Sequence, residues 1–423
     1  MPPVHPLPLW AGRTVALIGI VIVALNLRTA VSAVSPIARE IAVDIPLDNF
    51  ALGLLGMIPP IAFALSAIVT ASIARMLGLE LFLVIAIGLM VTGHLVRATA
   101  NGYGMLLIGS VLALVGMGIG NVLLPPLVKR YFPDRIGLMT ALYATLGSLG
   151  AAVPALLAVP IANATDWRIS LGIWSILAFT SLLPWLTLLA QQARGRVNGT
   201  TTDVAELPQL VPLRGRPIWR STVAWTIAVV FAMSSFNVYG MVAWLPDILA
   251  QTTESTAAQS GALLALYAAM GLPSALLIPV LAARMKNVGP LVQVGVLFFV
   301  AGDLGLLLFP GFATVWWVTM MGLGTLLFPV CLVLINLRSR TMHGAVALSG
   351  FVQGVGYAIA SLGPLLVGVL REATGGWLAV FIMLIASAIV ASVGGVLLRR
   401  PVCIEDQLGP RSGHRGLKSA EDK

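Results

Sequence analysis

Arg28 is the residue whose type and position point most directly to chemistry. It lies midway along an apolar run, residues 14–37, and a guanidinium in the middle of a membrane span costs roughly a few kcal/mol or more unless it is hydrated or paired. Its forked donors suit an anion or an electron-rich planar group. We interpret Arg28 as a fixed positive charge that binds such a solute. The structural alternative is an arginine that caps backbone carbonyls or pairs with another helix.

Neutral polar side chains accompany Arg28 on other apolar runs. Ser349, Gln353 and Tyr357 follow one another at i, i+4 and i+8, so a hydroxyl, an amide and a phenol share one helix face, which we expect to contact solute. Hydrogen bonding between helices is the structural alternative, and for tryptophan the alternative is the interfacial aromatic belt. Span seven likewise carries Asn237 and Trp244 on one face, together with two methionines, and Asn26 lies on the same run as Arg28. The remaining candidates for solute binding stand singly on their runs: Asn121, Tyr143 and Tyr267.

Two titratable residues inside apolar runs are candidates for proton coupling. Asp303 is the only carboxylate well inside a predicted span, and the internal repeat described below places His94 at the matching position. A structural polar contact is the alternative for both residues. Cys331 and Cys403 are too far apart in the sequence to indicate a disulfide framework or a metal cluster. We expect no metal and no cofactor.

The composition indicates which elements must position these residues. Of the 423 residues, 58% are hydrophobic and 10% are charged, whereas soluble domains carry about a quarter charged residues. The net charge of +9 would indicate a nucleic-acid partner only if the basic residues clustered on a folded soluble face. They stand instead at the ends of apolar runs. The chain is therefore predicted to be an all-α membrane protein whose partner is the lipid bilayer and not nucleic acid.

Twelve transmembrane helices are predicted, because about 20 helical residues cross the hydrocarbon and unpaired backbone is too costly there. Twenty of the 25 Lys and Arg then fall on the side that holds both chain ends, and four, Arg39, Arg97, Arg168 and Arg371, fall on the other. This asymmetry predicts a plasma (inner) membrane protein with both termini cytoplasmic. The predicted limits are 14–37, 50–74, 81–100, 103–127, 137–161, 169–190, 219–245, 258–282, 290–309, 312–335, 345–370 and 376–398.

A polar stretch, residues 191–217, divides the chain into two halves of six predicted helices, residues 1–190 and 218–399. We interpret it as a flexible cytoplasmic linker, and residues 400–423 as a disordered cytoplasmic tail. The halves repeat each other: the tripeptide at residues 74–76 (ARM) recurs at 283–285, and the GMG of residues 116–118 matches the GLG of 322–324. Parallel six-helix repeats around a site at mid-membrane are typical of transporters.

Five segments give the chain a resemblance to a known family. They are residues 25–30 (LNLRTA), 121–133 (NVLLPPLVKRYFP), 243–246 (AWLP), 337–341 (LRSRT) and 348–357 (LSGFVQGVGY). Through them the chain resembles the major facilitator superfamily, and within it the branch of cyanate permeases and 2-nitroimidazole transporters. The resemblance implies two six-helix bundles that rock about a central pocket lined by spans one, four, seven and ten. One signature departs: between spans two and three the family carries an acidic residue beside a basic cluster, where this chain has SIARMLGLE at 72–80.

The resemblance implies a secondary active transporter of a small solute, either a small anion such as a cyanate-like species or a small organic heterocycle. An efflux antiporter of the same fold is the alternative. A membrane-embedded enzyme would need converging catalytic groups, and the four histidines, at 5, 94, 343 and 414, are too dispersed to converge. A receptor would need a sensory domain, for which the linker and the tail are too short. We expect a monomer that is not an enzyme and whose partner is a small molecule.

Overall fold

The computed structural model describes residues 13–132, 134–197, 217–285, 287–340, 342–399 and 401–408, and this part of the chain is helical with no strand. Twelve segments in it are long and apolar enough to cross a membrane. Each overlaps one of the twelve predicted spans, so the predicted all-α membrane fold is confirmed. The observed segments are 14–44, 49–70, 79–98, 103–128, 141–164, 167–191, 222–252, 257–278, 289–308, 314–337, 347–374 and 378–397.

The first six spans form the N-terminal half. Several of its helices begin at capping side chains, as where the Asp48 carboxylate accepts from the Ala51 N–H and the Asp166 carboxylate from the Arg168 N–H. The elements are α1 (Thr14–Asn26), α2 (Thr29–Ser32), η1 (Ser35–Ile37), α3 (Ala38–Asp44), α4 (Asn49–Leu77), α5 (Leu79–Ala98), α6 (Tyr103–Tyr131), α7 (Ile136–Ala164), α8 (Trp167–Gly172) and α9 (Trp174–Val197).

The last six spans form the C-terminal half. Ser221 caps the first of these helices, and Thr256 and Gln259 form a capping box at the second. The elements are η2 (Ile218–Arg220), α10 (Thr222–Thr252), α11 (Ala257–Ala269), α12 (Gly271–Arg284), α13 (Gly289–Leu308), α14 (Thr314–Gly324), α15 (Leu327–Leu337), α16 (Met342–Ala360), α17 (Leu362–Thr374), α18 (Leu378–Leu397) and α19 (Ile404–Leu408).

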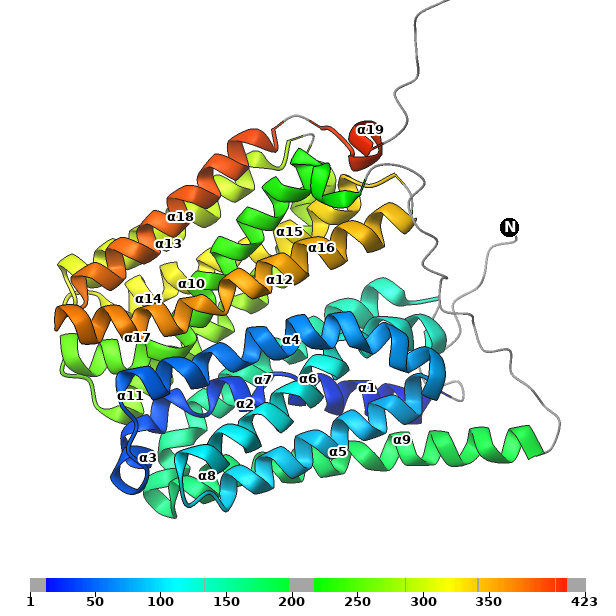
Figure 1. Cartoon of the computed structure of the whole chain (residues 1–423), viewed down its shortest axis with the longest axis horizontal. Helices are drawn as coiled ribbons and strands as arrows, with labels where there is room; N and C mark the ends of the chain where they lie inside the picture. The colour runs from blue at the N-terminus through cyan, green and yellow to red at the C-terminus, as the bar shows by residue number, and fades with distance from the viewer. Residues whose placement is uncertain are drawn as a thin grey trace, which may run out of the picture.

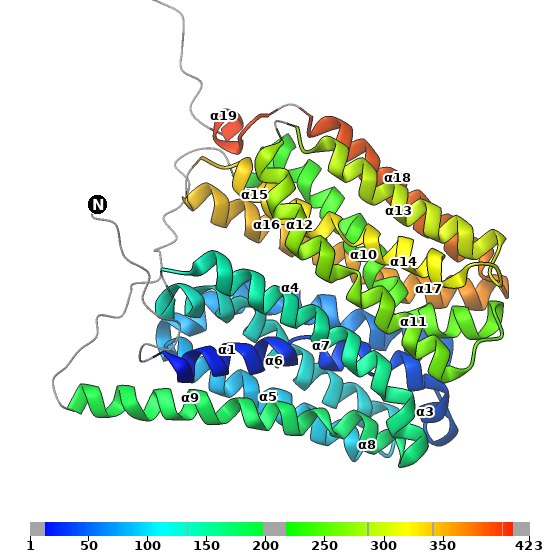
Figure 2. The same ribbon diagram turned by 180° about the vertical axis from the view of Figure 1, so that it is seen from behind.

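The two halves lie side by side with their long helices running in the same general direction (Figures 1 and 2). Thr14, which begins α1, and Leu397, which ends α18, lie at one end of the bundle, which we call the terminal face. The far face is the opposite end, where α3 and the start of α11 lie. Both views place α11 and α17 of the C-terminal half beside the N-terminal half near the far face.

Several spans are interrupted near their middles. Span one breaks between α1 and α2 at Leu27 and Arg28, and Arg28 has the non-helical backbone angles φ −134° and ψ 3°. Spans eight and eleven break at Met270 and Ser361. Broken helices at membrane depth are tolerated where neighbouring protein or water contacts the freed backbone groups. Span one is therefore interrupted at the residue that the sequence predicts to bind solute.

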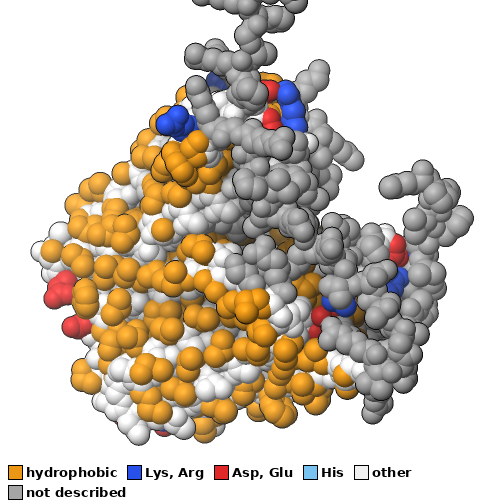
Figure 3. Space-filling model, turned by 45° about the vertical axis from the view of Figure 1, so that its right-hand side comes forward, with side chains coloured by type: hydrophobic (Ala, Val, Ile, Leu, Met, Phe, Trp, Pro, Cys, Tyr) orange, Lys and Arg blue, Asp and Glu red, His pale blue; other side chains and the backbone are white. Residues whose placement is uncertain are grey.

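Apolar side chains face outward along the membrane-spanning part of the molecule. Figure 3 shows hydrophobic side chains covering much of one side, while charged side chains gather near the ends. Ile68, Ile108 and Leu297 are examples that lie within spans two, four and nine and are well exposed. Because a soluble protein rarely leaves apolar patches of this extent in water, this surface is suited to lipid.

Two predicted boundaries differ from the structure. Helix α9 continues to Val197, past the predicted end of span six at residue 190, while the rest of the linker, residues 198–216, lies outside the described residues. Part of the segment predicted to be a disordered tail is ordered, because α19 buries Ile404 and Leu408 against the C-terminal half. Residues 409–423 lie outside the described residues.

Candidate functional site

Arg28 lies where the two halves meet. Its side chain interacts electrostatically with the phenols of Tyr239, on α10, and Tyr357, on α16. The break in span one frees the backbone at this point, so the guanidinium reaches across to the C-terminal half. Among the described residues no carboxylate forms an ion pair with Arg28. Its positive charge is therefore available to a ligand.

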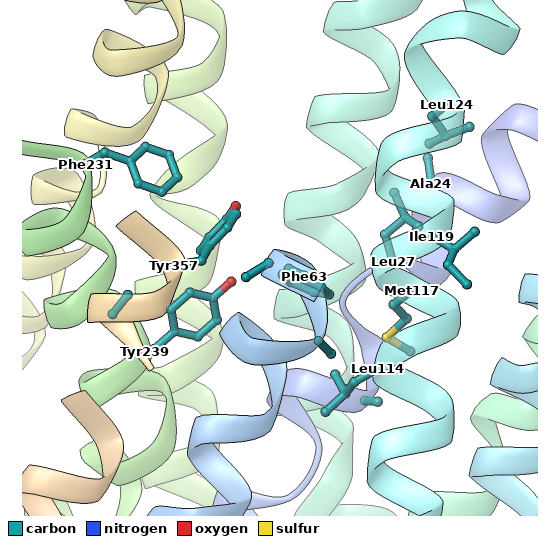
Figure 4. Packing of buried hydrophobic residues seen from close by; sticks show 14 of the residues in the cluster. Ala24, Leu27, Phe63, Leu114, Met117, Ile119, Leu124, Phe231, Tyr239 and Tyr357 are labelled. Atoms are coloured by element: carbon teal, nitrogen blue, oxygen red, sulfur yellow. The ribbon is translucent and has the colours of Figure 1, made fainter. Parts of the chain in front are cut away.

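Tyr357 is at the centre of an aromatic cluster that faces Arg28. Its ring makes edge-to-face contacts with Phe63 on α4 at 6.2 Å, with Phe231 on α10 at 5.0 Å and with Tyr239 at 6.3 Å between ring centroids. Figure 4 shows the hydroxyls of Tyr239 and Tyr357 pointing away from their helices toward the N-terminal half. The site thus combines a guanidinium, two phenolic donors and apolar ring faces.

The halves are closed against each other on the far-face side of this cluster. The Ser35 hydroxyl donates to the Val242 carbonyl at 2.7 Å, and the Arg39 guanidinium pairs with the Asp247 carboxylate at 3.1 Å. At Gly56 an added Cβ would lie 2.6 Å from the side chain of Pro364, so α4 and α17 touch closely. These contacts join the N-terminal half to the C-terminal half and block passage in this state.

The helix face that carries Tyr357 is open on its other side, toward the terminal face. An added Cβ at Gly354 or Gly350, one and two turns nearer that face, would meet no atom within 4 Å. Ser349 and Gln353 lie on the same stretch, where the Gln353 amide donates to the Ser349 hydroxyl at 2.7 Å. The predicted polar face of span eleven therefore borders open space beside Tyr357.

Asn121 and Tyr143 are the two other predicted residues that the structure leaves near this open side. Asn121, on α6, is half-buried and makes no hydrogen bond to another described residue. It lies two turns from Leu114, a residue that lines the pocket between the halves, so both share one helix face. Tyr143, on α7, is half-buried and lies one turn from Gly147, where an added Cβ would meet nothing within 4 Å.

Three predicted binding residues make structural contacts instead. The amide of Asn26 donates to the carbonyls of Ile22 and Leu177, which joins span one to span six. Asn237 donates to the Ser387 hydroxyl on α18, and the Trp244 indole donates to the Pro364 carbonyl at 2.9 Å. All three side chains are buried against neighbouring helices. For the two asparagines this is the structural alternative stated above, whereas Trp244 lies between helices and not in an interfacial belt.

The two proton-coupling candidates lie in different halves, each inside its own bundle. His94, on α5, has its Nδ1 at 3.2 Å from the Leu171 carbonyl and its Nε2 at 3.4 Å from the Thr29 hydroxyl. Asp303, on α13, is 1% exposed, and neither carboxyl oxygen has a hydrogen-bond partner among the described residues. The hydroxyl of Tyr267 is nearby and likewise has no hydrogen-bond partner there.

Tyr239 is the site residue that sequence reasoning missed. The polar face predicted for span seven was that of Asn237, and Tyr239 lies two residues on, toward the opposite side of the helix. The available signal was a tyrosine at mid-span on a helix that the family resemblance assigns to the pocket. Periodicity alone could not select it, because α10 is buried on nearly all sides.

Comparisons with known proteins agree with this architecture. The family model described as Major Facilitator Superfamily matches residues 16–361. The chain is 32% identical over 373 residues to a 2-nitroimidazole transporter of Escherichia coli (strain K12), covering 86% of this chain and 90% of that protein. It is 28% identical over 367 residues to the cyanate transport protein CynX of the same organism, covering 86% and 91%.

A solved structure shares the fold. It is a bacterial homologue of the human lysosomal transporter Spinster in an inward-facing and unoccupied conformation, which superposes with a TM-score of 0.74 at 15% identity over 95% of this chain and 99% of the other. The expectation that the chain is not an enzyme is confirmed, because the matching family and relatives are transporters. The chain is a member of the Major Facilitator Superfamily, and it transports small solutes.

Proposed function

We propose that this chain is a secondary active transporter of a small planar solute that is anionic or carries an electron-rich edge. The observation that carries the proposal is the contact of Arg28 with Tyr239 across the two halves, with no carboxylate paired to Arg28 among the described residues. A guanidinium and two phenols offer several donors to such an edge, and the fixed positive charge of the guanidinium disfavours a cation.

The aromatic cluster narrows the solute further. Phe63, Phe231 and the two tyrosines surround the donors with ring edges and faces, which suit a flat ring or a short linear ion better than a hydrated sugar. The relatives named for 2-nitroimidazole and for cyanate carry a flat nitroheterocycle and a linear anion. We infer that this chain takes a solute from one of these two chemical classes.

Alternating access follows from the closed and open sides of the site. With both termini in the cytoplasm of a plasma-membrane protein, as the distribution of Lys and Arg favours, the state described above is inward-facing. The far-face contacts at Arg39 and Asp247 would then break when the site opens outward. We propose that the halves are residues 1–190 and 218–399 and that the protein works as a monomer, since each half supplies part of one site.

Proton coupling is proposed for Asp303 rather than for His94. A carboxylate that is buried without any hydrogen bond is far more costly than the protonated acid, so Asp303 can take up or release a proton when water reaches it. His94 is held by Thr29 and Leu171, which fits a structural contact. Efflux by exchange with protons is the second candidate function, and Asp303 is the observation that favours it.

An uptake panel in proteoliposomes tests the proposal. Cyanate, benzoate and 2-nitroimidazole are offered to wild type, Arg28→Ala and Arg28→Lys, with and without a pH gradient. Wild type is expected to transport at least one solute, and Arg28→Ala is expected to lose about 10- to 150-fold in apparent affinity, because a hydrogen bond to a charged group contributes about 1.5–3 kcal/mol.

Control variants distinguish an effect on solute recognition from an effect on proton coupling. Arg168→Ala removes a charge from the far face, where Arg168 pairs with Asp44, and is expected to transport like wild type. If Arg28→Ala transports every accepted solute as well as wild type, the recognition proposal is wrong. If a pH gradient drives uptake in wild type and equally in Asp303→Asn, the role of Asp303 is wrong.

A further inference from the structure

Arg97 is a buried cation that the proposed site does not use. It lies in the last turn of α5, where the distribution of charges predicts an arginine at the membrane surface, yet it is 0% exposed. Its Nη1 donates to the Ala30 carbonyl at 3.5 Å, which is at the limit of a hydrogen bond. Its Nε and Nη2 have no hydrogen-bond partner among the described residues, and no described carboxylate pairs with it.

The fold makes room for this side chain. At Gly109, on α6, an added Cβ would lie 2.8 Å from the Cγ of Arg97, so the arginine stem occupies the space that a side chain would fill. One weak hydrogen bond does not offset the burial of a charged group, which costs several kcal/mol. A purely structural role therefore leaves the presence of a charge at this position unexplained.

The guanidinium lies directly behind the wall of the pocket between the halves. Ala30, whose carbonyl it contacts, and Ser110, which follows Gly109, both line that pocket, which we call the central pocket. Tyr239, the partner of Arg28, also lines it. A second pocket shares Ser35 and Leu52 with the first and contains Arg39 and the two carboxylates of Asp48 and Asp247, and we call it the mouth pocket.

Three arginines therefore lie between the far face, which is closed in this state, and the aromatic cluster. Arg39 lies at the mouth pocket on the far face, Arg97 lies behind the central pocket, and Arg28 lies at the aromatic cluster. Asp247 pairs only with the first of them in this state. Because Ala30 both accepts from Arg97 and lines the central pocket, little protein lies between this charge and the pocket.

We propose that Arg97 is a fixed positive charge that makes the central pocket attractive to anions and draws them between the mouth pocket and Arg28. Arg97 acts through its field and does not contact the solute. Fields of this kind are strong where low-dielectric protein replaces water. The burial of Arg97 without a partner lowers stability, and in return the charge lets the central pocket distinguish anions from other solutes. This inference deepens the proposed function, because it predicts an anion rather than a neutral heterocycle as the preferred solute.

A substrate-free measurement of the potential in the central pocket tests the inference. In a background of Cys331→Ala and Cys403→Ser, Val34→Cys places one thiol in the central pocket, which Val34 lines. The rates of its modification by anionic 2-sulfonatoethyl and cationic 2-(trimethylammonio)ethyl methanethiosulfonate are compared, each relative to a free thiol in solution. The anionic reagent is expected to react faster, and Arg97→Gln is expected to lower the rate ratio about fivefold or more.

Two further variants decide between charge and structure. Arg97→Lys keeps the charge and is expected to preserve the ratio, whereas Arg168→Gln removes a half-buried far-face charge that pairs with Asp44 and is expected to leave the ratio unchanged. Thermal unfolding of Arg97→Met is expected to occur at or above the wild-type temperature, since an unpaired buried charge has been removed. An unchanged ratio in Arg97→Gln, or the same fall in Arg97→Lys, would overturn the inference, whatever solute the uptake panel identifies.

Discussion

The hydroxyl of Tyr239 connects the arginine of one half to the aromatic cluster of the other. Each buried donor at this site has to be matched by an acceptor on the solute, because an unmatched donor costs about 1–3 kcal/mol. Arg28 and the tyrosines therefore discriminate by requiring electron-rich atoms, while Phe63 and Phe231 select for flatness. Recognition is divided between two halves that move relative to each other.

We expect Tyr239→Phe to weaken solute binding about 5- to 30-fold, because the phenyl ring keeps the aromatic packing while one donor of about 1–2 kcal/mol is lost. Binding is measured by the concentration dependence of uptake, and stability by thermal unfolding in detergent. The unfolding temperature should remain near that of wild type. A loss of stability without a loss of affinity would show that the hydroxyl is structural.

Asn237→Ala is expected to lower the unfolding temperature and to leave the solute affinity unchanged, the opposite of Tyr239→Phe. Its amide joins α10 to α18 through the Ser387 hydroxyl, and hydrogen bonds between membrane helices contribute about 0.5–2 kcal/mol. The variant should therefore unfold at a lower temperature and still bind solute with wild-type affinity. A large change in affinity at unchanged stability would show that Asn237 takes part in solute binding.

Sequence reasoning selected Arg28 because a guanidinium is unusual at membrane depth, and Tyr357 because it shares a helix face with Ser349 and Gln353. It did not distinguish Asn237 from Tyr239, since both are polar and stand two residues apart on a helix with few exposed positions. Which of them faces a neighbouring helix depends on the rotation of α10, and rotation is set by contacts with other spans. The burial of Arg97 was not predicted for a related reason, because it depends on the space left by Gly109.

At the scale of elements, span limits followed from hydropathy, whereas helix interruptions did not. The double prolines at 59–60 and 125–126 lie inside the uninterrupted helices α4 and α6. Spans eight and eleven break at Met270 and Ser361, each three residues before a proline, Pro273 or Pro364, whose missing N–H leaves the carbonyl four residues earlier without its helix partner. Span one breaks at Arg28 without such a proline, and the Thr29 hydroxyl beside it contacts His94 from another helix. That partner is distant in sequence, so local pattern cannot reveal the break at Arg28.

The start of α1 is tied to the loop after α6 by an ion pair. The Arg13 guanidinium bonds the Asp134 carboxylate, and this hydrogen bond holds the pKa of Asp134 below its usual value. A lowered pKa means that the pair stabilises the folded state above the unfolded value of about 4 and is lost as the pH falls through the folded value.

Wild type should therefore unfold at a higher temperature in detergent than Asp134→Asn, by a constant difference between about pH 5 and pH 8. This difference in unfolding temperature should disappear below about pH 4. The variant Asp166→Asn, which changes an acid of the far face, is the control for general acid destabilisation. If the difference between wild type and Asp134→Asn stays constant down to pH 3, the pair does not contribute as described.

For the whole molecule, the balance between its two states depends on the far-face contacts. Arg39 and Asp247 form an ion pair between the halves, with side chains that are 60% and 22% exposed. A pair this exposed contributes about 0.2–1 kcal/mol, so it adjusts the balance rather than fixing the state. The close packing of α4 on Pro364 supplies the rest of the closure.

We expect Asp247→Asn to raise the population open at the far face by up to about fivefold. Spin labels at Val43 and Leu378, which are exposed on α3 and α18, report the distance between the halves there. The distance distribution should gain a longer component in the variant. Asp166→Asn changes an acid within one half and should leave the distribution unchanged, and a change of equal size in both variants would contradict the prediction.

Helix α19 has a practical consequence for handling this protein. The side-chain amide oxygen of Gln407 accepts from the Ser221 hydroxyl at 2.7 Å and from the Val223 N–H at 3.3 Å, so a residue beyond the last span completes the start of α10. Asp406 also pairs with Arg340. Truncating the chain directly after span twelve would therefore remove these hydrogen bonds from the start of α10, the helix that carries Tyr239. Affinity tags or fluorescent fusions should be placed after residue 408.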